Sequence, residues 1–184
     1  MKKAVFLDRD GVVIEQVPYL HDVADVRLEK GVAEGVKKLH AAGFAVVVVT
    51  NQSGVARKLF TMADVEKVHA KIQELLAETG EKIDGFYVCP HHPEYDGECL
   101  CRKPKPGLLL QAARELDLDL ERSVMCGDKL SDVQSGINAR CALNILIRTG
   151  YGRSEESAAR AASVTDFCDD FAALAEAAVN RFPR

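Results

Sequence analysis

Two pairs of aspartates follow short apolar runs that lie far apart in the 184-residue sequence. Asp8 and Asp10 stand two positions apart, and Asp128 is followed four positions later by Asp132. Carboxylates gathered at one place repel one another unless a cation neutralises them, and an all-oxygen ligand set favours Mg²⁺ over zinc. Such a set suits phosphoryl transfer, because one carboxylate can attack phosphorus while a second moves the protons of the leaving oxygen and of water. Taken alone, Asp8–Gly11 is equally typical of a solvated turn.

Phosphate chemistry also needs hydrogen-bond donors and a fixed cation, and two segments supply them. Thr50 follows a valine-rich run and offers its hydroxyl together with the backbone amides after it. Lys103 offers a positive charge just ahead of a predicted helix that begins with proline. Arg102 and Lys103 seen alone are ordinary surface charges, but their position beside a cysteine cluster favours a role at the site.

Three thiols and an imidazole fall within thirteen residues, at Cys89, His91, Cys99 and Cys101. They match the Cys₃His ligand set of a structural zinc site, although the spacing is not the common C-x₂-C pattern. Protein ligands would fill all four positions and leave none for water, so this zinc would fold a loop instead of catalysing a reaction. Spacing alone does not distinguish His91 from His92, and a chance cluster of reduced surface cysteines is the alternative interpretation.

Short apolar runs alternate with longer segments of helical periodicity along the chain. This alternation predicts an α/β fold, a three-layer, doubly wound (Rossmann-like) parallel sheet with helices on both faces, with residues 1–184 as a single domain. Ligands of such sheets bind at the carboxyl ends of the strands, so the polar residues that follow the strands should meet at one edge. We expect strands at Ala4–Leu7, Ala45–Val49, Gly85–Val88, Val124–Cys126 and Asn144–Ile147. We expect helices at about residues 31–42, 62–79, 106–116, 131–140 and 169–181, and an exposed loop or short helix at 153–162.

The composition argues against several classes of partner. Hydrophobic residues make up 47% of the chain and charged residues 28%, which is typical of a globular domain. A net charge of −4, the lack of tryptophan and the lack of a long basic run argue against nucleic-acid binding. The apolar run before Asp8 is too short for a signal peptide and no stretch is long enough to span a membrane, so we expect a cytoplasmic protein with no membrane partner. Without a long exposed apolar repeat, we expect a monomer.

The order of these motifs resembles that of one superfamily. Asp-x-Asp-Gly after the first strand, Thr50 after a valine-rich strand, Lys103 before a helix and Gly-Asp-x-x-x-Asp after a later strand are together similar to the haloacid dehalogenase-like (HAD-like) phosphatases. The resemblance implies that Asp8 is the nucleophile and forms an aspartyl-phosphate, and that Asp10 is the general acid and base. It also implies that Thr50 and Lys103 stabilise the transferring phosphoryl group.

The same resemblance implies two metals. Mg²⁺ would be the catalytic cofactor, held by Asp8, the main-chain carbonyl of Asp10, Asp128 and the backbone at Lys129. Zn²⁺ would be structural, and its imidazole ligand would be His91, because the family pattern uses the first of the two histidines.

The loops that could hold a cap domain are short. About twenty residues separate Asp10 from the next predicted helix, and about seventeen separate the third strand from its helix, which is too few for a cap of ordinary size. A capless, open site must obtain its specificity from short loops. The resemblance implies that the substrate-binding residues are Gln16, Val17, Pro18 and Tyr19, then Thr50, Asn51, Gln52 and Ser53, and finally Arg102 and Lys103.

Within the superfamily, the zinc loop, the capless layout and the segments T-N-Q-S-G, C-P-H-H-P and R-K-P-K-P-G resemble the D-glycero-D-manno-heptose 1,7-bisphosphate phosphatases. This implies removal of the C7 phosphate of a sugar bisphosphate during synthesis of the heptose of lipopolysaccharide core. Histidinol-phosphate phosphatase of histidine synthesis is the alternative, and the short segment between His91 and Cys99 is closer to that branch. A catalytically idle, zinc-stabilised binding protein fits the same fold but has no need of Asp8, Thr50 and Lys103 together.

Overall fold

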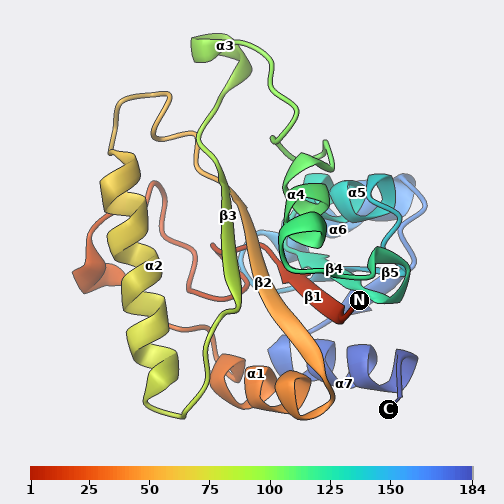
Figure 1. The fold of residues 1–184 in the computed structure, drawn as a ribbon. Coiled ribbons are helices and arrows are strands. Elements are labelled where there is room, and N and C mark those ends of the chain that lie inside the picture. Colours follow the sequence, from red (N-terminus) through yellow and green to blue (C-terminus); the bar gives the residue numbers. More distant parts are fainter. Residues whose placement is uncertain (184) are drawn as a thin grey trace.

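In the computed structural model, which describes residues 1–183, the chain forms a six-stranded sheet whose neighbouring strands are all parallel. The strand order is β3-β2-β1-β4-β5-β6, so the chain winds outwards from β1 in one direction and from β4 in the other (Figure 1). The junction between β1 and β4 is the switch point at which doubly wound sheets bind their ligands. The strands are β1 (Lys3–Leu7), β2 (Phe44–Asn51), β3 (Gly85–Cys89), β4 (Val124–Gly127), β5 (Leu143–Ile147) and β6 (Asp166–Cys168).

Helices cover both faces of the sheet, and alternate side chains of each strand pack beneath them. On β2, Val46 and Val48 belong to one apolar core, whereas Val47 and Val49 belong to the other. Helices α1, α2 and α7 complete the first core and α4 contributes to the second, with α1 and α7 side by side in Figure 1. The helices are α1 (Val32–Ala41), α2 (Met62–Ala77), α3 (Pro93–Asp96), α4 (Gly107–Glu115), α5 (Leu130–Asn138), α6 (Gly152–Ala161) and α7 (Phe171–Arg181).

The expected strands and helices are all present, with bounds that differ by a few residues, and the predicted α/β fold is confirmed. Residues 153–162, expected as an exposed loop or short helix, lie almost wholly in the ten-residue helix α6, which agrees with the second alternative. The strand β6 was not expected, because its three residues are too few to show an apolar pattern and only its last residue is buried. It pairs with β5 at one edge of the sheet.

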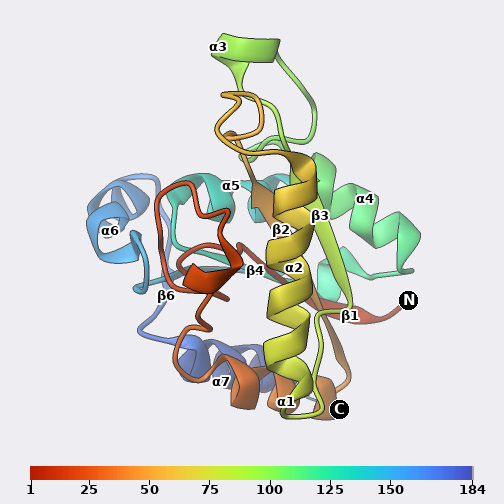
Figure 2. The ribbon, with the colours of Figure 1, turned by 90° about the vertical axis from the view of Figure 1, so that its left-hand side faces the viewer.

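The segments in which a cap could be inserted contain little regular structure. Among the described residues, only the 3₁₀ helix η1 (Val23–Asp25) lies between β1 and α1, and only α3 lies between β3 and α4. Figure 2 shows the β3–α4 segment projecting, with α3 at its tip, from the same end of the molecule as the loop after β2. That end is the carboxyl edge of the sheet, so both loops are placed to shape a site there. No helix in the part of the chain that the structure describes is long and apolar enough to cross a membrane.

The loop after β2 ends at a strongly capped helix start. The Thr61 hydroxyl accepts a hydrogen bond from the Asp64 N–H (3.3 Å), and the Asp64 carboxylate accepts one from the Thr61 N–H (3.0 Å), which together form a capping box. Phe60, just before this cap, is buried, and its ring occupies the space that a side chain at Gly54 would need. The capping box at Thr61 therefore fixes the position of the Phe60 ring in the loop after β2.

Candidate active site

Three buried aspartates form a cluster at the switch point of the sheet. Asp8 directly follows β1, Asp128 directly follows the neighbouring strand β4, and Asp132 lies in the first turn of α5. One carboxylate oxygen of each lies within 4.8 Å of the others, and all three side chains are buried. We call these three residues the carboxylate cluster. The sequence predicted that the strand ends would bring Asp8 and Asp128 together, and the structure does so.

A buried lysine crosses the carboxylate cluster. The Lys103 ammonium donates to Asp8 Oδ1 (2.9 Å) and to the Val49 carbonyl (2.8 Å), and it pairs with Asp132 Oδ1 (2.7 Å). Burial alone would lower the pKa of Lys103, but the charges of Asp132 and Asp8 raise it above its ordinary value. Burial raises the pKa of Asp8, yet the charge and hydrogen bond of Lys103 outweigh this and hold it below its usual value. Asp8 and Lys103 are therefore both charged at neutral pH.

The backbone of Lys103 is fixed by a side chain from the end of β2. The Asn51 amide nitrogen donates to the Lys103 carbonyl (3.2 Å), and the Lys103 N–H donates to Asn51 Oδ1 (3.1 Å). This two-point contact joins the end of β2 to the β3–α4 segment. Asn51, which was predicted to bind substrate, thus positions the residue that carries the Lys103 ammonium.

Asp128 has fewer partners than its burial requires. Its Oδ2 accepts a hydrogen bond from the Tyr151 N–H (2.8 Å), but its Oδ1 is buried with no partner. Burial raises the pKa of Asp128 to about 7, and the negative charge of Asp8 adds to this effect. At Gly11 and Gly150 a side chain would collide with the Asp128 carboxylate, and both glycines have positive φ. An unsatisfied oxygen in an all-carboxylate cluster fits a hard divalent cation such as Mg²⁺.

Asp10 stands beside the carboxylate cluster but outside it. Its carboxylate pairs with the buried Arg9 guanidinium (3.0 Å) and accepts a hydrogen bond from Gln52 Nε2 (2.8 Å). The same Gln52 nitrogen donates to the Thr50 hydroxyl (2.8 Å). Gln52 therefore joins two predicted catalytic residues, Asp10 and Thr50, and Arg9 and Gln52 together fix the direction of the Asp10 carboxylate.

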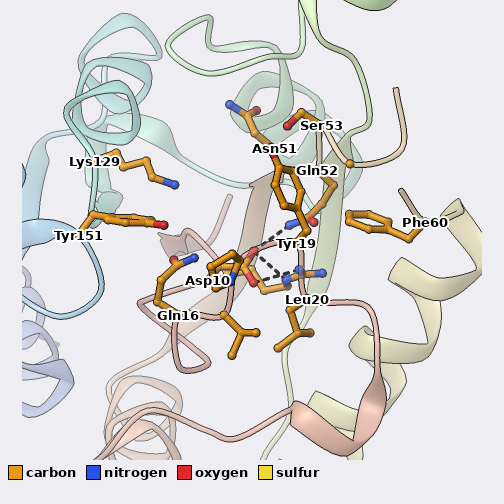
Figure 3. Close-up of a pocket in the computed structure, with 14 residues that line it drawn as sticks. Asp10, Gln16, Tyr19, Leu20, Asn51, Gln52, Ser53, Phe60, Lys129 and Tyr151 are labelled. Carbon is orange, nitrogen blue, oxygen red and sulfur yellow. Dashed lines mark hydrogen bonds and ion pairs between the residues drawn. The ribbon is translucent and has the colours of Figure 1, made fainter. Parts of the chain in front are cut away.

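A pocket of about 260 Å³ opens above Asp10 (Figure 3). Nine of the predicted site residues line it, namely Asp10, the four residues 16–19, the three residues 51–53 and Lys129. Arg102 does not, since its guanidinium donates to the His91 carbonyl (3.1 Å) on the β3–α4 segment. The side chains that line this pocket come from Arg9, Asp10, Gln16, Val17, Pro18, Tyr19, Leu20, Asn51, Gln52, Ser53, Phe60, Lys129 and Tyr151, with Gly54 between them.

A second group of metal-ligand type lies in the β3–α4 segment. The sulfurs of Cys89, Cys99 and Cys101 form a triangle with sides of 3.0, 3.4 and 3.6 Å, and we call it the thiol cluster. Burial raises the pKa of Cys89, and a hydrogen bond from Cys101 adds to the shift. The predicted fourth ligand, His91, is not within 4.8 Å of all three sulfurs; its Nδ1 instead pairs with an Asp96 carboxylate oxygen (2.8 Å).

Some residues of the site were not anticipated from the sequence. Asp132 was recognised as part of a motif, but not as a partner of Lys103, and its place in the first turn of a helix was the available signal. Lys129 was expected through its backbone, whereas its side chain lines the pocket. Phe60 and Tyr151 carried no motif. The glycines on both sides of Tyr151 were the one indication of a constrained turn.

Known proteins share both the sequence and the fold. A family model described as HAD-hydrolase-like matches residues 100–174. The D-glycero-beta-D-manno-heptose-1,7-bisphosphate 7-phosphatase of Haemophilus influenzae is 43% identical over 154 residues, which are 82% of this chain and 84% of that protein. The protein of the same name from Escherichia coli K12 is 43% identical over 152 residues, 80% of each chain. The crystal structure of D,D-heptose 1,7-bisphosphate phosphatase from B. bronchiseptica, complexed with magnesium and phosphate, has a TM-score of 0.88 and 36% identity, and the match covers 98% of this chain and 99% of that one.

Likeness of this extent covers nearly the whole chain. It places the chain among the HAD-like hydrolases, the class that the sequence motifs resemble. Within that class, the chain belongs to the family of D-glycero-beta-D-manno-heptose-1,7-bisphosphate 7-phosphatases.

Proposed function

We propose that this protein is a Mg²⁺-dependent phosphatase that removes the C7 phosphate of D-glycero-D-manno-heptose 1,7-bisphosphate through an aspartyl-phosphate. Two features of the carboxylate cluster carry the proposal. Asp8 accepts a hydrogen bond from the Lys103 ammonium, and a buried carboxylate oxygen of Asp128 has no partner. The first supplies a nucleophile and the second a place for a cation. The names of the two relatives state that they act on this substrate, and the chain matches each of them over four-fifths of its length or more.

Asp8, Asp128 and the main-chain carbonyl of Asp10 would hold Mg²⁺, with the backbone at Lys129. The bound ion would supply positive charge against the phosphate oxygens. The B. bronchiseptica relative, whose fold this chain shares, is complexed with magnesium and phosphate. Lys103 already neutralises part of the carboxylate cluster, so a single divalent ion suffices for the remainder.

The protein's own groups would divide the reaction into two steps. An Asp8 oxygen attacks phosphorus and forms an O–P bond, while the bond between phosphorus and the sugar C7 oxygen breaks. Asp10 donates a proton to the leaving oxygen, then takes a proton from the water that cleaves the aspartyl-phosphate and releases inorganic phosphate. Lys103 and the Thr50 hydroxyl stabilise the phosphoryl oxygens. Arg9 and Gln52, which both contact the Asp10 carboxylate, would hold it in place for these proton transfers.

The thiol cluster would hold a structural Zn²⁺, with His91 as the fourth ligand. Zinc-bound histidines usually donate their second ring nitrogen to a carboxylate, and the contact between His91 Nδ1 and Asp96 leaves Nε2 for the metal. The backbone N–H of His91 also donates to Cys89, which favours the thiolate form. Such a site would anchor the segment that carries Lys103 and Arg102. All six cysteines are free, which suits a reducing compartment, and we propose the cytoplasm.

A phosphate-release panel tests the proposed function. The purified protein with Mg²⁺ would receive heptose 1,7-bisphosphate, histidinol phosphate or fructose 1,6-bisphosphate, and the Asp8→Asn variant would serve as the blank. We expect kcat/KM for the heptose substrate to exceed the others by about 100-fold, the range that a few specific contacts provide. A preference for histidinol phosphate would overturn the substrate and keep the reaction, whereas release from none of the three would overturn both.

A further inference from the structure

The turn between β5 and α6 presents a single side chain to the pocket. Gly150 has a φ of +52°, and a Cβ there would collide with the Asp128 carboxylate. A Cβ at Gly152 would collide with the Ile147 carbonyl. Both neighbours of Tyr151 therefore have to be glycine. Tyr151 is the one residue of this Gly-Tyr-Gly turn whose side chain is free to vary.

The backbone and the side chain of Tyr151 have separate tasks. Its main-chain N–H donates to Asp128 Oδ2, and this contact persists whatever side chain the residue carries. Its side chain instead lines the pocket and is 41% exposed. In Figure 3 the phenol reaches inward from the side opposite Phe60, with its hydroxyl towards the interior of the pocket. A substitution at this position would thus change the pocket wall without removing the hydrogen bond to Asp128.

The Tyr151 ring also carries a cation. The Lys129 ammonium lies 4.8 Å from the ring centroid, within the range of a cation–π contact. Lysine side chains lose considerable rotamer entropy when they are fixed, so a ring that already restrains the chain lowers that loss on binding. Figure 3 shows Lys129 and Tyr151 side by side on the same wall of the pocket.

Lys129 is the pocket-lining cation whose charge is still available. Arg9 is paired with Asp10, and Lys103 is paired within the carboxylate cluster. Arg102 lies outside the pocket. Among the described residues, no carboxylate lies within ion-pair distance of the Lys129 ammonium, although its charge helps to lower the pKa of Asp8 and opposes the rise in the pKa of Asp128. A substrate group that carries negative charge away from the reacting phosphate would therefore meet Lys129 and the Tyr151 hydroxyl together.

We propose that Tyr151 is a specificity-determining residue, whose ring positions Lys129 and whose hydroxyl contacts the part of the substrate remote from Asp8. The inference rests on the proposed function only in requiring a sugar phosphate with a second polar or anionic group. It assigns the choice of substrate to a side chain of the β5–α6 turn, which is not one of the loops predicted from the sequence to bind substrate. Tyr151 takes no part in the chemical step.

Two variants separate the two contributions of Tyr151. Tyr151→Phe removes the hydroxyl and keeps the ring, and we expect it to raise KM for heptose 1,7-bisphosphate by about threefold, within the range of one hydrogen bond. Tyr151→Leu removes both, and we expect KM to rise about tenfold, as the cation–π contact is also lost. We expect kcat to change by less than about twofold, because neither contact differs between ground state and transition state. With acetyl phosphate, which has no sugar and no second phosphate, all three proteins should have equal kcat/KM.

A double-variant cycle tests whether the ring acts through Lys129. Tyr151→Leu should raise KM less in a Lys129→Met background than in the parent protein, because residues that act together are not additive. Tyr95→Leu is the matched control, since Tyr95 is an exposed tyrosine that carries Arg57 on its ring (4.7 Å) but does not line the pocket.

Three outcomes would overturn the proposal. They are an equal loss with acetyl phosphate, an unchanged KM in both Tyr151 variants, and full additivity with Lys129→Met. If the parent protein fails to act on the heptose substrate, the proposed function falls by itself. The role of Tyr151 is then decided by the same variants with fructose 1,6-bisphosphate.

Discussion

The carboxylate cluster and the thiol cluster are both groups of metal-ligand type, but they lie in parts of the molecule that are built differently. Asp8 and Asp128 follow two strands paired in the middle of the sheet, and Asp132 starts a helix that packs on it. Their side chains are buried, and Lys103 crosses between two of them. The sheet therefore brings these charges together before any metal binds.

The thiol cluster has much weaker support from the fold. Only Cys89 belongs to a strand, whereas Cys99 and Cys101 lie in a segment whose one regular element is the four-residue α3. Both of these later cysteines are half-buried. When few helices or strands hold the ligands in place, metal binding contributes directly to folding. The comparison thus predicts a preorganised magnesium site and a zinc site that orders its own loop.

The largest effect is expected from the nucleophile. Asp8→Asn keeps the size of the side chain and its place beside Lys103, but it removes the attacking oxygen anion. We expect phosphate release to fall by about 10⁴-fold, as for other residues that act in one catalytic unit. The measurement is phosphate release at saturating Mg²⁺. Asp117→Asn is the control, since the Asp117 side chain is exposed and its carboxylate pairs with the N-terminal ammonium. Turnover of Asp8→Asn at the rate of this control would exclude Asp8 as the nucleophile.

Removal of Mg²⁺ is expected to stop the reaction and leave the fold in place. Several kcal/mol of charge stabilisation are lost, so we expect at least about a 100-fold drop in phosphate release, restored within mixing time when Mg²⁺ is added back. The thermal midpoint should move by only a few degrees, because Lys103 keeps the carboxylate cluster together. Far-UV and near-UV circular dichroism of the Mg²⁺-free protein would check this. Loss of the near-UV signal would mean that the carboxylate cluster also needs its metal to form.

The zinc site is expected to respond in the opposite way. Cys99→Ser should abolish stoichiometric zinc and lower the thermal midpoint by about 10 °C, which corresponds to roughly 3 kcal/mol for a chain of this size. Metal analysis and calorimetry provide the measurements. Cys141→Ala is the control, because Cys141 is a buried cysteine of the apolar core that does not belong to the thiol cluster. If Cys99→Ser retained its zinc and its midpoint, the structural-zinc interpretation would be wrong.

The sequence predicted the features that depend on one strand or one motif. The four-valine run on β2 indicated burial on both faces, and each valine is indeed buried. The aspartates after β1 and β4 were placed together by the general geometry of parallel sheets. Such features depend on short-range patterns, and backbone topology then makes them converge.

Features that depend on the direction of a side chain were beyond that reasoning. Arg102 was expected at the pocket, but its guanidinium donates to the His91 carbonyl instead. Gln52 was expected to contact substrate, and its side chain also joins Asp10 to Thr50. The Arg102 contact lies within the β3–α4 segment, and the Gln52 contact joins the residues after β1 to those after β2. Neither contact is encoded by the residues next to it in the sequence.

The smallest expected effect concerns the stability of the metal-free protein. The pKa of Asp128 is raised from 3.8 to about 7, because burial and the charge of Asp8 disfavour the ionised form. The folded state then binds this proton more tightly than the unfolded state does, so stability falls as pH rises from about 4 to about 7 and stays low above that range. Asp128→Asn removes this deficit. We expect its thermal midpoint without Mg²⁺ at pH 8 to exceed that of the parent by a few degrees, and Mg²⁺ to give it no further stabilisation.

Asp132→Asn is the matched variant, with an opposite expected sign. The substitution removes the negative charge that pairs with the buried Lys103 ammonium. The thermal midpoint should therefore fall, even though a carboxylate is again replaced by an amide. A fall in both variants would show that both carboxylates stabilise the metal-free protein. A rise for Asp128→Asn with a fall for Asp132→Asn would show that Asp128 destabilises the metal-free protein and is kept to bind the cation. The thiol cluster should carry no such cost in stability.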